Sequence, residues 1–317
     1  MAALTLPSPS LEAVGLSHNY GQFAALSDLN LRLEGQKCVG FLGPNGAGKT
    51  TTMKVFTGLI KANKGKALVN GVDIRKDKKG ALASCASLIE TPEIYPSLTP
   101  REALAMLCEI RGVPKAERNT RIEEVLGEVK MQDWVDKKTG SFSKGMKQRV
   151  NVASTLIGDP DVVILDEPTT GLDPRGMSEV RDIVKSLGNR LVFMSSHLLA
   201  EVTEVCNEVA MIDHGKLIVY DSISNITARF AGVRGSVEIG FSIDVSDAVK
   251  SRIASITGVQ GVEQMNPREL LVKFDHVNTS QETLFNEVAS LKAGAISLKE
   301  STSGLEDAYL SLIKETL

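Results

Sequence analysis

Short apolar runs recur along the first 220 positions and alternate with stretches of helical spacing. The runs that favour strands are 11–16, 29–33, 38–42, 162–165, 191–194, 208–213 and 216–220. The helical stretches between the later runs are 145–157, 176–188 and 198–206. Runs that are apolar throughout are typical of central parallel strands. Strands that alternate with helices predict an α/β core.

Two further patterns add pieces to this core. Asn70-Gly71 stands between short apolar runs, which predicts a tight hairpin and an antiparallel piece. Residues 91–142 have mainly helical spacing and predict a helical insertion. One helix begins at Thr99-Pro100-Arg101-Glu102, where a capping box meets a proline at the first helical position, and another begins near Lys115.

A boundary is expected between Asp221 and Gly235, where polar residues and glycines break the pattern. We therefore assign residues 1–222 to one domain and 223–317 to a smaller one. In the smaller domain, segments with strand-like and helix-like spacing of apolar residues follow one another in the order β-α-β-β-α-β. This order predicts a ferredoxin-like α+β fold. A further helix is expected after Ser303. We find no catalytic cluster in the sequence of this domain, and we interpret it as a dimerisation or regulatory module.

Composition narrows the class of protein. The 317 residues are 42% hydrophobic and 24% charged, with a net charge of −3, so nucleic acid is not an expected partner. The four cysteines are scattered, which favours a reducing compartment. We see no signal peptide in residues 1–10 and no apolar run near the roughly 18 residues that span a bilayer. A cytoplasmic protein is expected, which would serve a membrane only through a partner.

The run 38–42 leads into a glycine-rich segment that matches G-x-x-x-x-G-K-[ST], the phosphate-binding P-loop. Its residues are Gly43, Pro44, Asn45, Gly46, Ala47, Gly48, Lys49, Thr50 and Thr51. Backbone N–H groups and the following helix N-terminus would face the phosphates of a nucleoside triphosphate. Lys49 would lie along the β- and γ-phosphates, and the Thr50 hydroxyl would ligate Mg²⁺. The alternative is a plain glycine-rich turn.

Three side chains at the ends of apolar runs suit the same reaction. Asp166 fits a second contact to Mg²⁺, and Glu167 could orient and deprotonate a water beside the γ-phosphate. His197 follows another apolar run and could hydrogen-bond the γ-phosphate from the ligand crevice. The alternatives are a solvent-facing acidic pair and a structural histidine.

Ser143 opens a second helix whose N-terminus would suit a phosphate. Since the chain already has one triphosphate cradle, we expect this one to serve a nucleotide held by another subunit. A plain N-cap is the alternative.

Together these motifs resemble those of the ATP-binding cassette (ABC) ATPases. The P-loop, Ser143 to Arg149, Ile164 to Pro168, Gly171-Leu172-Asp173 and His197 occur in the order of that family. The resemblance covers about residues 11–220. It implies a P-loop NTPase fold with a RecA-like core, an antiparallel β-subdomain and a helical subdomain, and it implies ATP hydrolysis. It also implies that Tyr20 stacks on adenine and that two cassettes enclose two ATPs. Each ATP would then lie between one P-loop and the Ser143 and Gly145 segment of the other chain, with Asp173 at the interface.

Two positions depart from the family pattern. The usual signature is Leu-Ser-Gly-Gly-Gln, from which Phe142, Lys144 and Met146 differ. Glu90 stands where a glutamine is usual; it could still meet Mg²⁺, and we include it among the catalytic candidates. These departures resemble the type-2 exporter branch, which includes bacitracin-resistance-like and multidrug or sodium exporters, as does the segment near Leu305.

The resemblance implies an ATP-hydrolysing subunit of an exporter. It would pair with a second cassette and a separate membrane permease, at the cytoplasmic face of the membrane. One alternative is a soluble ABC ATPase that acts in translation or DNA repair. The other is a weakly hydrolysing regulatory subunit.

Overall fold

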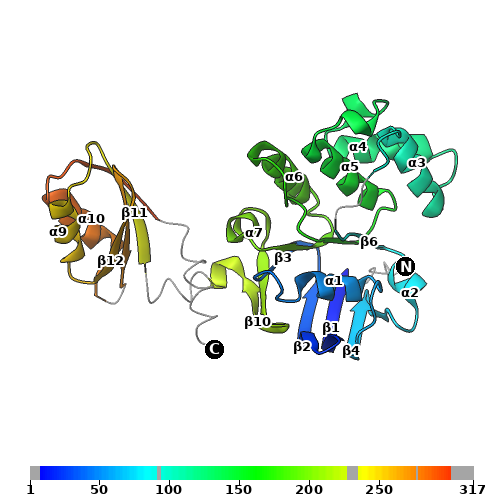
Figure 1. Ribbon diagram of the computed structural model, residues 1–317, viewed down its shortest axis with the longest axis horizontal. Coiled ribbons are helices and arrows are strands. Elements are labelled where there is room, and N and C mark those ends of the chain that lie inside the picture. Colours follow the sequence, from blue (N-terminus) through cyan, green and yellow to red (C-terminus); the bar gives the residue numbers. More distant parts are fainter. Residues whose placement is uncertain (1–7, 91–93, 227–234, 276–277, 301–317) are drawn as a thin grey trace, which may run out of the picture. The chain divides into compact units, whose positions relative to one another are not determined.

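The computed structural model describes residues 8–90, 94–226, 235–275 and 278–300 (Figure 1). Contacts within the chain divide it into two units, Met1–Asp221 and Ser222–Leu317. The first unit contains two sheets with their helices, and the second contains one sheet.

A six-stranded sheet forms the centre of the first unit. Its order is β10 (Lys216–Ser222), β9 (Glu208–Asp213), β3 (Lys37–Leu42), β8 (Leu191–Ser196), β7 (Val162–Leu165) and β6 (Cys85–Leu88). The pairs from β9 through β3, β8 and β7 to β6 are parallel. Every residue of β7 and β8 is buried, as expected for central strands covered on both faces. The structure therefore confirms the α/β core.

Helices connect these strands and fill the core. They are α1 (Lys49–Phe56), α5 (Lys144–Leu156), α6 (Pro174–Ser186) and α7 (Leu199–Val205). Phe193 of β8 packs against Phe41 of β3 and Phe56 of α1, with ring centroids 5.0 and 6.2 Å apart. All three rings are fully buried. The strand that precedes the P-loop, the helix that follows it and the strand before His197 thus share one packed core.

A second, antiparallel sheet accompanies the first. It contains β2 (Phe23–Glu34), β1 (Ser10–Tyr20), β4 (Lys64–Val69) and β5 (Val72–Asp73) in that order, and the short helix α2 (Lys78–Ala81) follows. Val69 pairs with Val72 across Asn70 and Gly71, whose φ angles are 49° and 76°. Both turn residues are left-handed, as an Asn-Gly hairpin requires, so the expected antiparallel piece is confirmed.

The insertion is helical where it is described. It contains α3 (Pro100–Ile110), α4 (Arg118–Glu128) and 3₁₀ turns at Gln132–Trp134 and Thr139–Ser141. The predicted capping box is present, since Glu102 N donates to Thr99 Oγ1 at 3.2 Å and Thr99 N donates to Glu102 Oε2 at 2.8 Å. The second helix begins at Arg118 rather than near Lys115, because Glu117 N bonds back to Pro114 O in a turn.

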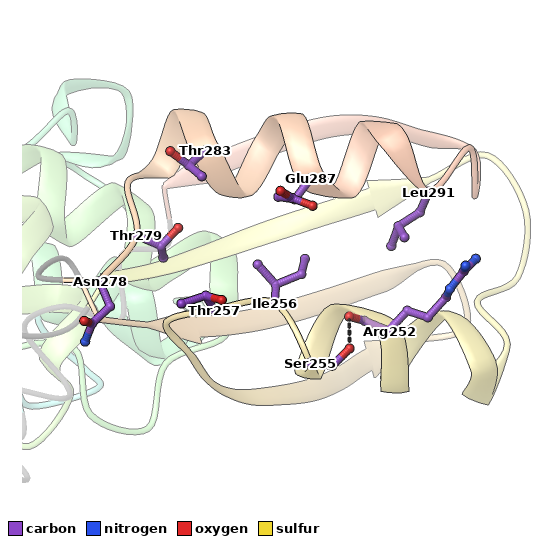
Figure 2. Close-up of a pocket in the computed structure, with 9 residues that line it drawn as sticks. All are labelled: Arg252, Ser255, Ile256, Thr257, Asn278, Thr279, Thr283, Glu287 and Leu291. Atoms are coloured by element: carbon purple, nitrogen blue, oxygen red, sulfur yellow. Dashed lines mark hydrogen bonds between the residues drawn. The ribbon is translucent and has the colours of Figure 1, made fainter.

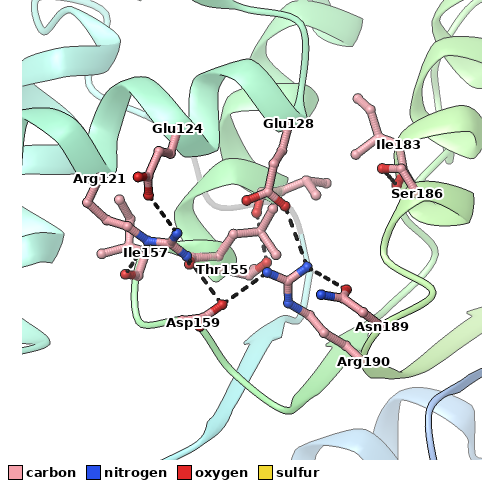
Figure 3. Close-up of polar contacts among 12 residues, drawn as sticks. Arg121, Glu124, Glu128, Thr155, Ile157, Asp159, Ile183, Ser186, Asn189 and Arg190 are labelled. Carbon is pink, nitrogen blue, oxygen red and sulfur yellow. Dashed lines mark hydrogen bonds and ion pairs between the residues drawn. The ribbon is translucent and has the colours of Figure 1, made fainter.

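A cluster of ion pairs joins the insertion to the loops before β7 and β8 (Figure 3). Arg190, only 8% exposed, donates to Asp159 Oδ1 at 3.1 Å and lies 3.5 Å from Glu128 of α4. Arg121 of α4 lies 3.6 Å from the same oxygen of Asp159. Since Asp166 and His197 directly follow β7 and β8, this cluster fixes the insertion to the strands that lead into the candidate site.

The second unit has the predicted ferredoxin-like arrangement. Its elements are β11 (Gly235–Phe241), α9 (Asp247–Ala254), β12 (Val259–Asn266), β13 (Glu269–Phe274), α10 (Gln281–Ser290) and β14 (Ala295–Glu300). The strand order is β12-β13-β11-β14, and each pair is antiparallel. The helix expected after Ser303 and the segment near Leu305 lie outside the described residues.

Candidate functional site

The P-loop connects β3 to α1 in a curled backbone. Gly46 and Gly48 have φ angles of 85° and 107°, which favour glycine. A Cβ on Gly48 would lie 2.5 Å from Ala25 O, so no larger residue fits there without a shift. Gly215 N, in the β9–β10 turn, donates to Ala47 O at 2.9 Å and fixes the loop from outside. These features fit the expected phosphate cradle.

Lys49 is the buried cation of this loop. Its side chain is 5% exposed, and Nζ donates to Gly43 O at 2.8 Å and Pro44 O at 3.1 Å. The same nitrogen lies 3.5 Å from Glu167 Oε1. The structure thus brings the P-loop lysine and the expected catalytic carboxylate into direct contact.

Glu167 is the centre of the polar contacts. Its Oε2 lies 3.1 Å from His197 Nδ1 and accepts from Thr170 Oγ1 at 2.8 Å. Burial by itself raises the pKa of Glu167, but the Thr170 hydrogen bond and the charges of His197 and Lys49 outweigh it and lower the pKa. Glu167 is therefore ionised at neutral pH. It follows the end of β7, and its φ of 44° is left-handed, so the strand conformation ends before this residue.

Asp166 lies next to this cluster and is 9% exposed. Ser195 Oγ donates to its Oδ1 at 2.6 Å, and Glu167 N donates to the same hydroxyl at 2.9 Å. Among the described residues, no basic side chain lies within ion-pair distance of Asp166. A buried carboxylate without a protein cation fits the oxygen ligand set that Mg²⁺ prefers.

Ser143, Gly145 and Asp173 form a second group at the adjacent N-termini of α5 and α6. Ser143 Oγ accepts from Met146 N at 3.2 Å, and Asp173 Oδ1 accepts from Gly176 N at 3.2 Å. A Cβ on Gly145 would lie 3.3 Å from Gly176 Cα, so glycine permits the close approach of the two helices. In the parts of the chain that are described, no hydrogen bond or ion pair joins these residues to the P-loop.

Packing explains the phenylalanine at the first position of the altered signature. Phe142 is 6% exposed and meets Trp134 edge to face, with centroids 5.7 Å apart. Trp134 therefore takes part in the packing of the insertion. Further along α5, Gln148 Nε2 donates to Pro168 O at 2.7 Å, which links the signature helix to the loop after Glu167.

Glu90 and Tyr20 lie apart from the contacts around Glu167. Glu90 is 70% exposed and accepts from Lys54 Nζ at 2.5 Å, a hydrogen bond that raises the pKa of Lys54. Tyr20 ends β1, is 49% exposed, and meets His18 edge to face at 4.6 Å. An exposed aromatic ring at a hairpin tip leaves a face open to a ligand.

The sequence interpretation missed the hydroxyl groups that hold the carboxylates. Thr170 bonds Glu167, and Ser195 bonds Asp166. The sequence carried only a weak signal for them: each hydroxyl lies within three residues of an assigned site residue at the end of a buried strand.

The second unit has a separate pocket of about 340 Å³ between α9 and α10 (Figure 2). Arg252 and Glu287 line it with several hydroxyls, and both charged residues are exposed. It contains none of the residues expected for nucleotide chemistry.

Comparisons with known proteins agree with this geometry. Residues 26–170 match the ABC transporter family. The bacitracin transport ATP-binding protein BcrA of Bacillus licheniformis is 40% identical over 214 residues, 67% of this chain and 69% of that protein. The linearmycin resistance ATP-binding protein LnrL of Bacillus subtilis is 28% identical over 313 residues, 97% of this chain and 99% of that protein.

Solved structures agree as well. A structure described as the ATP-binding subunit of an ABC transporter superposes with a TM-score of 0.62 at 28% identity, and the match covers 70% of this chain and 93% of that one. The chain therefore belongs to the ABC transporter family, as an ATP-binding and ATP-hydrolysing cassette.

Proposed function

We propose that this cassette is the ATPase subunit of an exporter, that it acts as a pair with a second cassette, and that it drives a separate membrane permease. The observation that supports its hydrolytic role is the position of Glu167, which contacts Lys49, His197 and Thr170 at once. A regulatory cassette with little turnover would not need an ionised carboxylate held in this way.

The contacts assign a role to each side chain. Ionised Glu167 accepts a proton from the attacking water and orients it, an effect of about 10²–10⁴-fold. His197 holds Glu167 through Nδ1 and presents the other ring nitrogen for a γ-phosphate oxygen. Lys49 leaves the carbonyls of Gly43 and Pro44 for the β- and γ-phosphates.

Thr50 and Asp166 would hold Mg²⁺, with Glu90 as a further candidate once it leaves Lys54. When bound, the ion neutralises charge on the phosphate oxygens. Ser195 keeps one oxygen of Asp166 occupied, so its other oxygen is the one offered to a ligand.

The second group of residues supports the paired arrangement. Ser143, Gly145 and Asp173 lie at neighbouring helix N-termini, where N–H groups favour an anion, but within the described residues no hydrogen bond or ion pair joins them to their own P-loop. We assign them to the nucleotide of the partner cassette. Tyr20 is assigned to the adenine ring.

The export role rests on the relatives. Their names describe bacitracin transport, linearmycin resistance and, for the protein SrtF of Streptococcus pyogenes that is 33% identical over 225 residues, lantibiotic transport. No helix in the described parts of this chain is long and apolar enough to cross a bilayer. A membrane permease as partner, and a place at the inner face of the membrane, follow from that role.

The test is Glu167→Gln in the chain co-expressed with the products of its neighbouring genes. We expect ATP binding to persist, turnover to fall about 10²–10⁴-fold, and the paired cassettes to stay closed on ATP. Glu109→Gln changes a carboxylate of α3 whose side chain is 74% exposed, so it is the control and should turn over normally. Wild-type turnover in Glu167→Gln would remove its role as base. A wild-type chain that fails to co-purify with any membrane protein would contradict the export role.

A further inference from the structure

Helix α7 carries a buried carboxylate that the mechanism above does not use. Glu201 is 3% exposed. Its Oε1 accepts from Thr169 Oγ1 at 2.5 Å, and its Oε2 accepts from Ser196 Oγ at 2.7 Å. Both donors are buried and neutral, and the carboxylate bridges the turn after Glu167 to the last residue of β8.

Each bridged residue lies beside a member of the proposed catalytic pair. Thr169 stands in the tight turn that follows Glu167, in which Thr170 N donates to Glu167 O at 3.1 Å. Ser196 immediately precedes His197, and Leu198 N donates to Ser196 Oγ at 2.9 Å, which closes the backbone around the histidine. Glu201 therefore fixes the separation of the two loops whose side chains meet at Glu167 and His197.

Stability alone does not explain a carboxylate at this position. No basic side chain of the described residues lies within ion-pair distance of Glu201, so the carboxyl group is buried against two hydroxyls. Taking a carboxyl group out of water without a basic partner costs free energy, and an apolar side chain of similar size would serve the fold at least as well. On the same helix, Glu204 shows the ordinary surface arrangement, 3.0 Å from both Arg181 and Lys185.

We propose that Glu201 is a positioning residue, which sets the contact between Glu167 and His197 by holding the loop of each through one oxygen. A carboxylate suits this task because its two oxygens accept from two hydroxyls in a fixed geometry. This inference rests on the roles proposed above for Glu167 and His197.

The experiment measures ATPase kinetics of the assembled transporter with Glu201→Ala, Glu201→Gln, His197→Ala and the double variant. We expect Glu201→Ala to lower kcat about 10- to 100-fold with KM for ATP unchanged, by analogy with the loss seen when the hydrogen-bond partners of metal-ligating side chains are removed. Glu201→Gln keeps the shape and one acceptor oxygen, so it should restore most of kcat. In the His197→Ala background, adding Glu201→Ala should cause little further loss, because coupled residues are not additive.

Controls separate the possible failures. Glu204→Ala changes the exposed carboxylate of the same helix and should leave kcat unchanged. If Glu201→Ala does not fold, Thr169→Val removes one of the two bridges and should also lower kcat. Wild-type kcat in Glu201→Ala, or additive losses in the double variant, would overturn the proposal for Glu201. Wild-type kcat in His197→Ala alone would instead overturn the role proposed for the histidine.

Discussion

Lys49→Ala tests the phosphate site most directly, and the structure sets the size of its effect. Lys49 is 5% exposed, and without nucleotide its ammonium donates to Gly43 O and Pro44 O. These bonds are exchanged for phosphate oxygens on binding, so only the net gain of a charged hydrogen bond contributes to affinity. That gain is about 1.5–3 kcal/mol, which corresponds to about a 10- to 150-fold rise in the Kd for ATP.

The measurement is calorimetric or fluorescent titration of ATP against wild type and Lys49→Ala. Lys61→Ala removes the same charge from an exposed position of the same unit and should bind ATP as the wild type does. Thermal unfolding of both variants checks that the fold is kept. An unchanged Kd in Lys49→Ala would refute the assignment of this loop to the triphosphate, whereas a weaker Kd in Lys61→Ala would point to a general charge effect.

Three other predictions concern the insertion and its attachment. Arg190→Met should lower the free energy of unfolding by about 1.5–3 kcal/mol in urea titrations, whereas Arg175→Met, whose side chain is 87% exposed, should change it by less than about 0.5 kcal/mol; equal effects would contradict the account of the cluster. Phe142→Leu should shift the fluorescence of Trp134, the single tryptophan, because the ring loses its edge-to-face partner; an unchanged emission spectrum would count against that contact. At the N-terminal cap of α3, the Glu102 carboxylate accepts a hydrogen bond from a backbone N–H, which lowers the pKa of Glu102. The stability that this bond contributes is present above the pKa of Glu102 in the unfolded chain and is lost as the pH falls through its pKa in the folded protein. Glu102→Gln should therefore flatten the fall of Tm below about pH 5, and an identical fall in both proteins would contradict it.

Local patterns predicted most of the fold because several physical rules agreed at each element. The apolar runs 162–165 and 191–194 became fully buried strands, and Asn70-Gly71 became the left-handed turn it favours. The sequence placed the start of α4 near Lys115 instead of Arg118. The turn between Pro114 and Glu117 is closed by a backbone hydrogen bond, which side-chain patterns do not predict.

The candidate site was predictable only in part. Motif spacing identified Lys49, Glu167 and His197, and the structure brings them into contact. Motifs could not predict that Glu90 would pair with Lys54, since that contact joins α1 to a separate strand end. Hydroxyl partners such as Ser195 were also missed, because serine is common and its role depends on which loop folds against it.

The left-handed backbone at Glu167 has a consequence for how this protein tolerates mutation. Glutamate is a poor residue for a φ of 44°, a conformation that costs about 1–2 kcal/mol outside glycine, asparagine and aspartate. Replacement by glycine or asparagine would relieve that strain while it removed the proposed base. Selection for thermal stability alone would thus favour variants that lack the proposed base, so on this proposal part of the folding free energy is given up to keep a carboxylate at this position.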